Sequence, residues 1–132
     1  MAAPALSRIL QIDDDADILA VGEVALQGYG GFEVRSAQTG AQALQAARDF
    51  APQLILLDWM MPGMDGPATL RALRTAPALA RVPVVYLTAT VSPRLREEAL
   101  ASGAVDMLIK PFVPRQLVAD LNQIWERCHG IA

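Results

Sequence analysis

The chain has 132 residues, a length that suits one domain rather than two. Hydrophobic residues make up 53% of it and the formal net charge is −3 at pH 7, which is typical of a globular domain with an apolar core. The absence of a basic block argues against direct nucleic-acid binding. No apolar run is long enough to cross a bilayer, and the first residues lack a secretory signal, so we expect a cytoplasmic protein without membrane contact. The single cysteine, Cys128, fits that location and excludes an intramolecular disulfide.

Short apolar runs alternate with helical patterns along the whole chain. The predicted strands are 8–12, 32–35, 54–57, 82–87 and 105–109, and the predicted helices are 16–27, 39–50, 66–75, 92–103 and 114–128. Residues that favour helix N-termini stand at the expected starts: Asp15, Thr39 with Gln42 as a capping box, and Ser92 followed by Pro93. Apolar spacing predicts the buried faces of two helices: Ile18, Gly22, Ala25 and Tyr29 on the first, and Leu117, Leu121, Ile124 and Cys128 on the last.

The run Leu54–Leu57 is apolar without alternation, which indicates a strand buried on both faces of a sheet. Alternating strands and helices imply right-handed crossovers and a parallel sheet covered on both sides. We therefore expect an α/β three-layer sandwich: five parallel strands in the order 2-1-3-4-5 with five helices, a flavodoxin-like fold. Residues 7–128 form the expected domain, with a loose tail at 1–6 and a C-terminal tail at 129–132. The Pro62-Gly63 pair should break the chain after the third strand.

Polar side chains follow the predicted strands at one edge of the sheet. Asp13 and Asp14 come after the first strand, Asp58 after the third, Thr88 after the fourth and Lys110 after the fifth. Each has an ordinary interpretation, as a helix cap, a turn residue or a solvated lysine; it is the joint arrangement that indicates a site. Three carboxylates repel one another unless a cation intervenes, and an all-oxygen site suits Mg²⁺. Together with a hydroxyl and an ammonium, such a site could stabilise a phosphoryl group, including an acyl phosphate on Asp58 itself.

These residues lie in segments that resemble the receiver domain of two-component response regulators. The matching segments are Ile12-Asp13-Asp14, Leu57-Asp58, Met61 through Gly66, Leu87-Thr88-Ala89 and Lys110-Pro111-Phe112. The resemblance covers residues 7–128, and it is specific through the order and spacing of the segments. It implies a phosphoacceptor signalling domain rather than an enzyme, in which Asp58 takes a phosphoryl group from a sensor histidine kinase or a phosphotransfer protein.

The same resemblance implies roles for the other site residues. Asp14 would ligate Mg²⁺ directly, Asp13 through water, and Asp58 and the backbone carbonyl of Met60 would complete the protein ligands. Thr88 and Lys110 would contact the phosphoryl oxygens, and the Lys110–Pro111 bond is expected to be cis. Thr88 would also move inward on phosphorylation, and the resulting conformational change would appear on the face made by the fourth helix, fifth strand and fifth helix. At position 107, where many receivers carry Tyr or Phe, this chain has Met107, which we expect to repack passively.

Three alternatives accompany this interpretation. A degenerate receiver that only binds protein would have lost the acceptor set, whereas all its members stand here. A Mg²⁺-dependent aspartyl phosphatase commonly has a second aspartate two residues after the nucleophile, where this chain has Met60. A flavodoxin-like cofactor binder needs a hydroxyl- and glycine-rich loop where Asp13-Asp14-Asp15 stands. The downstream protein target stays open, as do a monomer or a weak dimer, and a complete regulator or a part of a longer chain.

Overall fold

The computed structural model describes residues 4–61 and 65–129. The strands are β1 (Arg8–Ile12), β2 (Glu33–Ala37), β3 (Leu54–Asp58), β4 (Val84–Thr88) and β5 (Asp106–Ile109). The helices are α1 (Ala16–Gly30), α2 (Gly40–Phe50), α3 (Gly66–Arg74), α4 (Pro93–Ala101) and α5 (Pro114–Cys128), with a short 3₁₀ turn at Pro77–Leu79. The predicted Pro62-Gly63 break lies outside the described residues.

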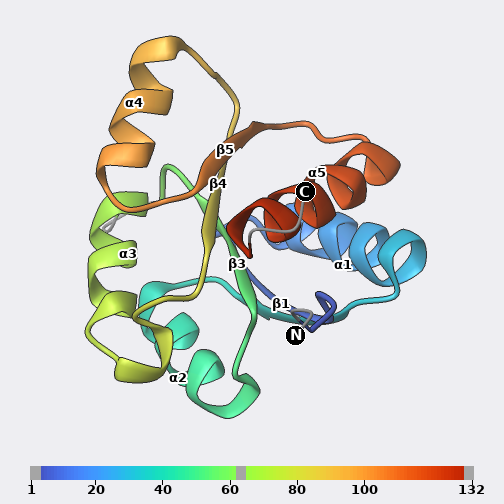
Figure 1. The fold of residues 1–132 in the computed structure, drawn as a ribbon, viewed down its shortest axis with the longest axis horizontal. Coiled ribbons are helices and arrows are strands. Elements are labelled where there is room, and N and C mark those ends of the chain that lie inside the picture. The colour runs from blue at the N-terminus through green and yellow to red at the C-terminus, as the bar shows by residue number, and fades with distance from the viewer. Residues whose placement is uncertain (1–3, 62–64, 130–132) are drawn as a thin grey trace.

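The five strands form one parallel sheet in the order β2-β1-β3-β4-β5, which confirms the predicted fold class. Helices α1 and α5 lie side by side on one face of the sheet, and α2, α3 and α4 lie on the other (Figure 1). β1 and β3 are parallel neighbours at the point where the connections switch from one edge of the sheet to the other, so the carboxyl ends of these two strands lie side by side near the centre of the sheet. That point is where an open α/β sheet binds its ligands.

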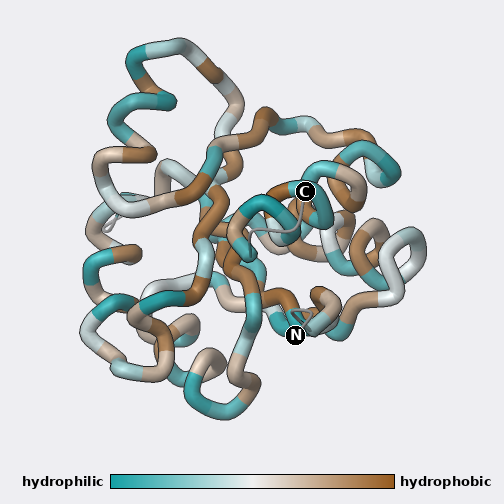
Figure 2. The backbone as a smooth tube through the Cα atoms, in the orientation of Figure 1, coloured by the Kyte–Doolittle hydropathy of each residue, from teal (hydrophilic) through white to brown (hydrophobic). Residues whose placement is uncertain are grey.

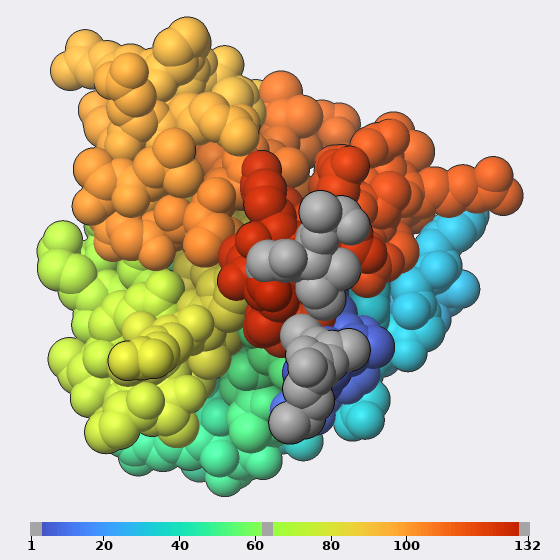
Figure 3. All heavy atoms as spheres, viewed as in Figure 1, coloured from blue at the N-terminus to red at the C-terminus, as the bar shows by residue number. Residues whose placement is uncertain are grey.

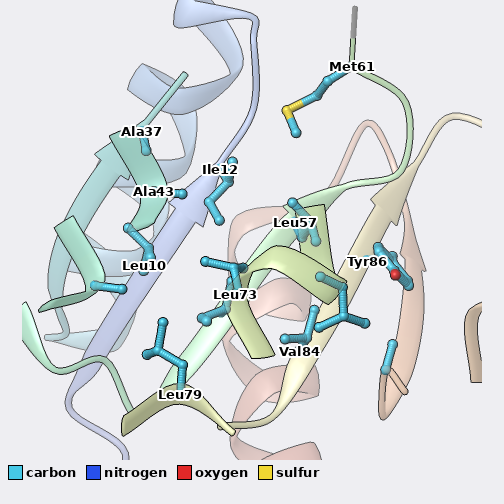
Figure 4. Close-up of a cluster of buried hydrophobic side chains, with 14 of the residues drawn as sticks. Leu10, Ile12, Ala37, Ala43, Leu57, Met61, Leu73, Leu79, Val84 and Tyr86 are labelled. Carbon is cyan, nitrogen blue, oxygen red and sulfur yellow. The ribbon is translucent and has the colours of Figure 1, made fainter. Parts of the chain in front are cut away.

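Burial follows from the two-residue period of the central strand. Ile55 and Leu57 of β3 point into the apolar cluster under α2 and α3, whereas Leu54 and Leu56 point into the cluster under α1 and α5. Figure 2 shows the hydrophobic colour concentrated along the strands at the centre of the molecule. In Figure 4, Leu57 of β3 and Tyr86 of β4 lie on neighbouring strands within the first of these clusters. A rigid, doubly covered strand therefore ends at Asp58.

Helix caps agree with the sequence, with one local change. Asp15 accepts the N–H groups of Asp17 and Ile18, and Ser92 accepts that of Leu95. Thr39 caps α2 through the N–H of Gln42, but the Gln42 side chain accepts from the N–H of Gln38 instead of Thr39. The chain before β1 is also held from Pro4 on, because the Pro4 carbonyl accepts the Trp125 indole N–H at 2.9 Å.

The predicted buried faces of two helices were partly wrong. On α1 the buried residues are Leu19, Gly22, Ala25 and Leu26. Tyr29, predicted to be buried, is 55% exposed and lies 5.8 Å from the guanidinium carbon of Arg115. On α5, Trp125 takes the buried place predicted for Cys128, which is exposed. The apolar residues at Val21 and Val24 blur the α1 pattern, because they are exposed as well. The 3₁₀ turn after α3 was not predicted.

A buried polar contact explains why α1 has a glycine at its centre. Gln11 of β1 is buried, and its amide donates to the Leu19 carbonyl at 2.7 Å and to the Ser36 hydroxyl at 2.9 Å. A Cβ at Gly22 would stand 2.1 Å from the Gln11 side-chain oxygen. A side chain at position 22 must therefore displace this amide from its partners.

We predict that Gly22→Ala destabilises the fold by about 1–2 kcal/mol, because lost buried hydrogen bonds outweigh the better helix propensity of alanine. Gly28→Ala in the same helix is the control, since no atom lies within 4 Å of its added Cβ, and it should stabilise by about 0.5–1 kcal/mol. Urea unfolding of both variants measures the difference. An equal stabilisation by the two substitutions would contradict the role given to Gln11.

Candidate functional site

Three carboxylates meet at the carboxyl edge of the central strands. Asp13 follows β1 and Asp58 ends β3, and the pairing of Ile12 with Leu57 brings the two side by side. One carboxylate oxygen from each of Asp13, Asp14 and Asp58 lies within 4.8 Å of the other two. Asp13 and Asp58 are buried, and Asp14 is exposed to solvent. The structure therefore brings together the acidic residues that the sequence singled out.

Lys110 is the counter-charge for this cluster. It follows β5, two strands away from Asp58, and its ammonium lies 3.2 Å from Asp13 Oδ2 and 3.2 Å from Asp58 Oδ1. The Lys110–Pro111 peptide is cis, as the resemblance implied. The Lys110 N–H also donates to the Thr88 carbonyl at 2.7 Å, so the backbone of this loop is tied to the neighbouring strand. One ammonium thus bridges two buried carboxylates.

The electrostatics of the cluster favour uptake of a positive charge. Burial and the charge of Asp13 raise the pKa of Asp58 from 3.8 to about 6, although Lys110 and the Met60 N–H lower it in part. Burial by itself lowers the pKa of Lys110, but its contacts with Asp13 and Asp58 outweigh that effect and raise the pKa above its usual value. Lys110 therefore stays charged near neutral pH, and the carboxylates keep an excess of negative charge around it.

The loop after β3 completes the surroundings of Asp58. The Met60 N–H donates to Asp58 Oδ1 at 3.4 Å, so the Met60 backbone lies beside the carboxylate, and its side chain is 67% exposed. Trp59 is half-buried and meets the Tyr86 ring edge-on, with the ring centroids 4.8 Å apart. The site thus has an indole directly after its central carboxylate.

Thr88 and Met107 lie on the strands beyond β3. Thr88 ends β4 and is buried, and its hydroxyl donates to the Thr90 carbonyl at 3.1 Å while the Thr90 N–H reaches the same oxygen at 3.3 Å. The hydroxyl is therefore engaged with its own loop. Met107 of β5 is 2% exposed and packs in the cluster that also holds Tyr86.

The donor set fits a hard divalent cation. All three acidic side chains offer oxygen, one of them is open to water, and Mg²⁺ in proteins typically keeps several waters beside one or two carboxylates. No thiol or imidazole belongs to the cluster, which disfavours a zinc or copper site.

The sequence interpretation missed one charged cluster, which lies at the start of β5, the end of that strand away from Lys110. Asp106 of β5 is buried and accepts from Arg96 of α4 at 2.7 Å and from Arg127 of α5 at 3.0 Å. An aspartate inside an apolar strand was the available signal, because a buried carboxylate requires partners. Gln38, also not singled out, donates its amide to the Asp14 carbonyl at 3.4 Å.

Comparison with known proteins identifies the family. Residues 9–122 match the family model described as the response regulator receiver domain. The chain belongs to that family. It is 44% identical over 112 residues to the DNA-binding response regulator MtrA of Mycobacterium tuberculosis and 42% identical over 120 residues to the transcriptional regulatory protein PrrA of the same species. The matches cover 85% and 91% of this chain but 47% and 50% of those proteins, so the chain spans about half the length of these relatives.

Solved structures agree with this assignment. The chemotaxis response regulator CheY4 of Vibrio cholerae superimposes with a TM-score of 0.84 at 32% identity, covering 91% of this chain and 99% of that one. The receiver domain of the Francisella response regulator 1452 gives 0.79 at 31% identity, covering 92% and 98%. This receiver domain is thus a signalling domain of a two-component system. Within the described residues, no helix is long and apolar enough to cross a membrane.

We predict that Asp58→Asn stabilises the metal-free receiver at pH 7.5 by about 1–3 kcal/mol. The pKa of Asp58 is about 6 when folded and 3.8 as its ordinary value. Between these values the folded state holds the extra proton, so the stability contributed by the neutral form is complete below pH 3.8 and is lost as the pH rises through 6. Asparagine stays neutral and avoids that loss. Denaturant unfolding with chelator should show the gain at pH 7.5 and little of it at pH 4; the same gain at both would contradict the shift.

Proposed function

We propose that this receiver domain accepts a phosphoryl group on Asp58, in a Mg²⁺-dependent reaction, from a phosphohistidine on a sensor histidine kinase or a phosphotransfer protein. The observation that carries the proposal is the pair of contacts from Lys110 to Asp13 and Asp58 within a cluster of three carboxylates. An ammonium held at Asp58 Oδ1 is a donor already positioned where negative charge grows during phosphoryl transfer. We infer a cytoplasmic location from the membership of this chain in the response regulator receiver family.

The reaction needs one bond made and one broken. An Asp58 carboxylate oxygen forms the new P–O bond, and the P–N bond of the phosphohistidine breaks. The imidazole leaves with the bonding electron pair, and its ring nitrogen then takes a proton from water. The product is an acyl phosphate on Asp58, which water later hydrolyses to the carboxylate and inorganic phosphate.

The surrounding residues have separate tasks. Asp13, Asp14, Asp58 and the Met60 carbonyl are the residues to hold Mg²⁺, which when bound would offset the charge of the phosphoryl oxygens. Lys110 would move from Asp58 Oδ1 to a phosphoryl oxygen. The Thr88 hydroxyl, now bonded to the Thr90 carbonyl, would turn to another phosphoryl oxygen and draw its loop with it. Met107 beside it has no ring to swing and would repack instead.

The output of this switch is proposed to be a protein contact. Exposed apolar side chains on the face of α4, β5 and α5 support this, namely Val91, Ile109 and Val113. MtrA is named as a DNA-binding regulator, which is in tension with our expectation of no direct nucleic-acid contact, but that protein is about twice the length of the match. A net charge of −3 disfavours contact between these 132 residues and DNA phosphates.

Phosphorylation of Asp58 is tested with acetyl phosphate and Mg²⁺, followed by intact-mass measurement. We expect one added phosphoryl group on the wild type and none on Asp58→Asn. The control is Asp15→Asn, since Asp15 stands in the same acidic run but caps α1 and asparagine can cap as well. Equal labelling of wild type and Asp58→Asn would contradict the proposal.

Metal binding is tested separately, by the fluorescence of Trp59 during Mg²⁺ titration. Removing Asp14 deletes one oxygen ligand and one negative charge, so we expect Asp14→Ala to weaken Mg²⁺ binding by at least about tenfold. A Trp125→Phe background isolates the signal of Trp59, because Trp125 is the other of the two tryptophans in the chain. A titration curve that is the same with and without Asp14 would remove it from the ligand set.

A further inference from the structure

Helix α4 has little burial to fix it in position. Every residue of α4 is described by the structure, and Ala99 is the one among them that is buried. The neighbouring α3 buries Gly66, Thr69, Leu70 and Leu73, and α5 also has a continuous buried stripe. Figures 1 and 3 show α4 at an outer corner of the molecule. A helix with so small an apolar contact depends on specific bonds for its placement.

One of these bonds lies at the C-terminal end of α4. The Tyr86 hydroxyl is 2.9 Å from the Ser102 hydroxyl, and the Ser102 hydroxyl is 2.7 Å from the Ala99 carbonyl, to which it donates. Tyr86 is completely buried, and burial raises the pKa of its phenol despite the hydrogen bond to Ser102. A phenol in an apolar core requires a partner, and its partner here is Ser102, the C-cap residue that follows α4.

The Tyr86 ring packs against the two ends of the segment that joins β3 to α3. Trp59 contacts it edge-on, and a Cβ on Gly66, the first residue of α3, would stand 2.8 Å from its Cε1. Tyr86 is two residues before Thr88 on β4, so both side chains point to the same face of the sheet. Register pairs Tyr86 with Met107 on β5. Tyr86 therefore connects the C-terminal end of α4, through Ser102, with Trp59, the residue that follows Asp58.

The two ends of α4 are held unequally. Arg96, in the middle of the helix, pairs with Asp106 at 2.7 Å. Within the described chain, no ion pair or side-chain hydrogen bond links residues 92–95, at the N-terminal end of the helix, to the sheet. Leu95 is only partly buried against the apolar core. The preceding loop, Ala89–Val91, is exposed. Movement of Thr88 and its loop thus reaches the loosely held end of α4 first.

We propose that Tyr86 and Ser102 anchor the C-terminal end of α4, so that phosphorylation at Asp58 moves the helix as a lever about that end. This inference rests on the proposed function and adds the pivot. The N-terminal turn of α4, with Val91 and the loop before it, swings toward or away from β5, while Ala99–Gly103 keeps its place. Tyr86 acts as a positioning residue, because its hydroxyl bonds to Ser102 at the end of α4 rather than to a member of the acidic cluster.

The test compares Tyr86→Phe with Tyr29→Phe by amide NMR. Phenylalanine keeps the ring and its packing and removes only the hydroxyl. Tyr29 is an exposed tyrosine of α1, a helix that covers the other face of the sheet (Figure 1). In the free proteins we expect amide hydrogen exchange of Ala99–Gly103 to become roughly two- to tenfold faster in Tyr86→Phe, with no change in Tyr29→Phe. In a Ser102→Ala background, Tyr86→Phe should add nothing further, because its partner is already gone.

Beryllofluoride, which mimics the phosphoryl group, tests the lever itself. In the wild type, ligand-induced shifts should be large at 89–95 and small at 99–103, and in Tyr86→Phe they should extend through 99–103. Equal shifts along α4 in the wild type, or the wild-type pattern in Tyr86→Phe, would overturn the anchor. If beryllofluoride gives no Asp58-dependent change in the wild type, the proposed function fails; the anchor is then decided by hydrogen exchange alone, and unchanged exchange in Tyr86→Phe overturns it.

Discussion

The contact on which this receiver depends is the ammonium of Lys110 between two buried carboxylates. Asp13 and Asp58 lie close together in a partly water-excluded site, where like charges repel strongly and each desolvated carboxylate is costly. Lys110 offsets part of that cost at 3.2 Å from both. Asp14 adds a third negative charge at the solvent edge. The folded protein therefore tolerates the cluster, which still has an excess of negative charge, and this excess is what the proposed phosphoryl transfer with a divalent cation requires.

The sheet supplies the geometry that makes this contact possible. Asp58 ends a strand that is buried on both faces, so packing fixes the position of its backbone. β1 is the parallel neighbour of this strand, which brings Asp13 beside Asp58. Lys110 reaches the pair from β5, the edge strand, across the end of β4. A change of charge at Asp58 consequently alters the electrostatic contacts of residues at the ends of three strands, β1, β3 and β5. Helix α4 has one buried residue, fewer than any other α-helix of the described chain, and for this reason we propose it as the helix that responds to such a change.

The sequence predicted the fold and the acidic cluster because both rest on strong local patterns. Apolar runs that alternate with helical segments define the sheet, and the strand ends carry the charged residues. What it could not predict comes from contacts between distant segments. The hydrogen bond of Tyr86 to Ser102 joins a strand to a helix end, and burial of Trp125 in place of Cys128 depends on Pro4, over a hundred residues away. On α1, exposed valines obscured the stripe, so periodicity selected Tyr29 where packing selected Leu26.

The most direct test of the electrostatic account is the titration of the Asp58 carboxyl carbon by ¹³C NMR, with and without Mg²⁺. In metal-free protein its pKa should lie near 6, because burial and Asp13 disfavour the charged form. Saturating Mg²⁺ should lower that pKa markedly, since the cation competes with the proton for the same oxygen. A metal-free pKa at the ordinary value of 3.8, or a raised value that Mg²⁺ leaves unchanged, would contradict the account.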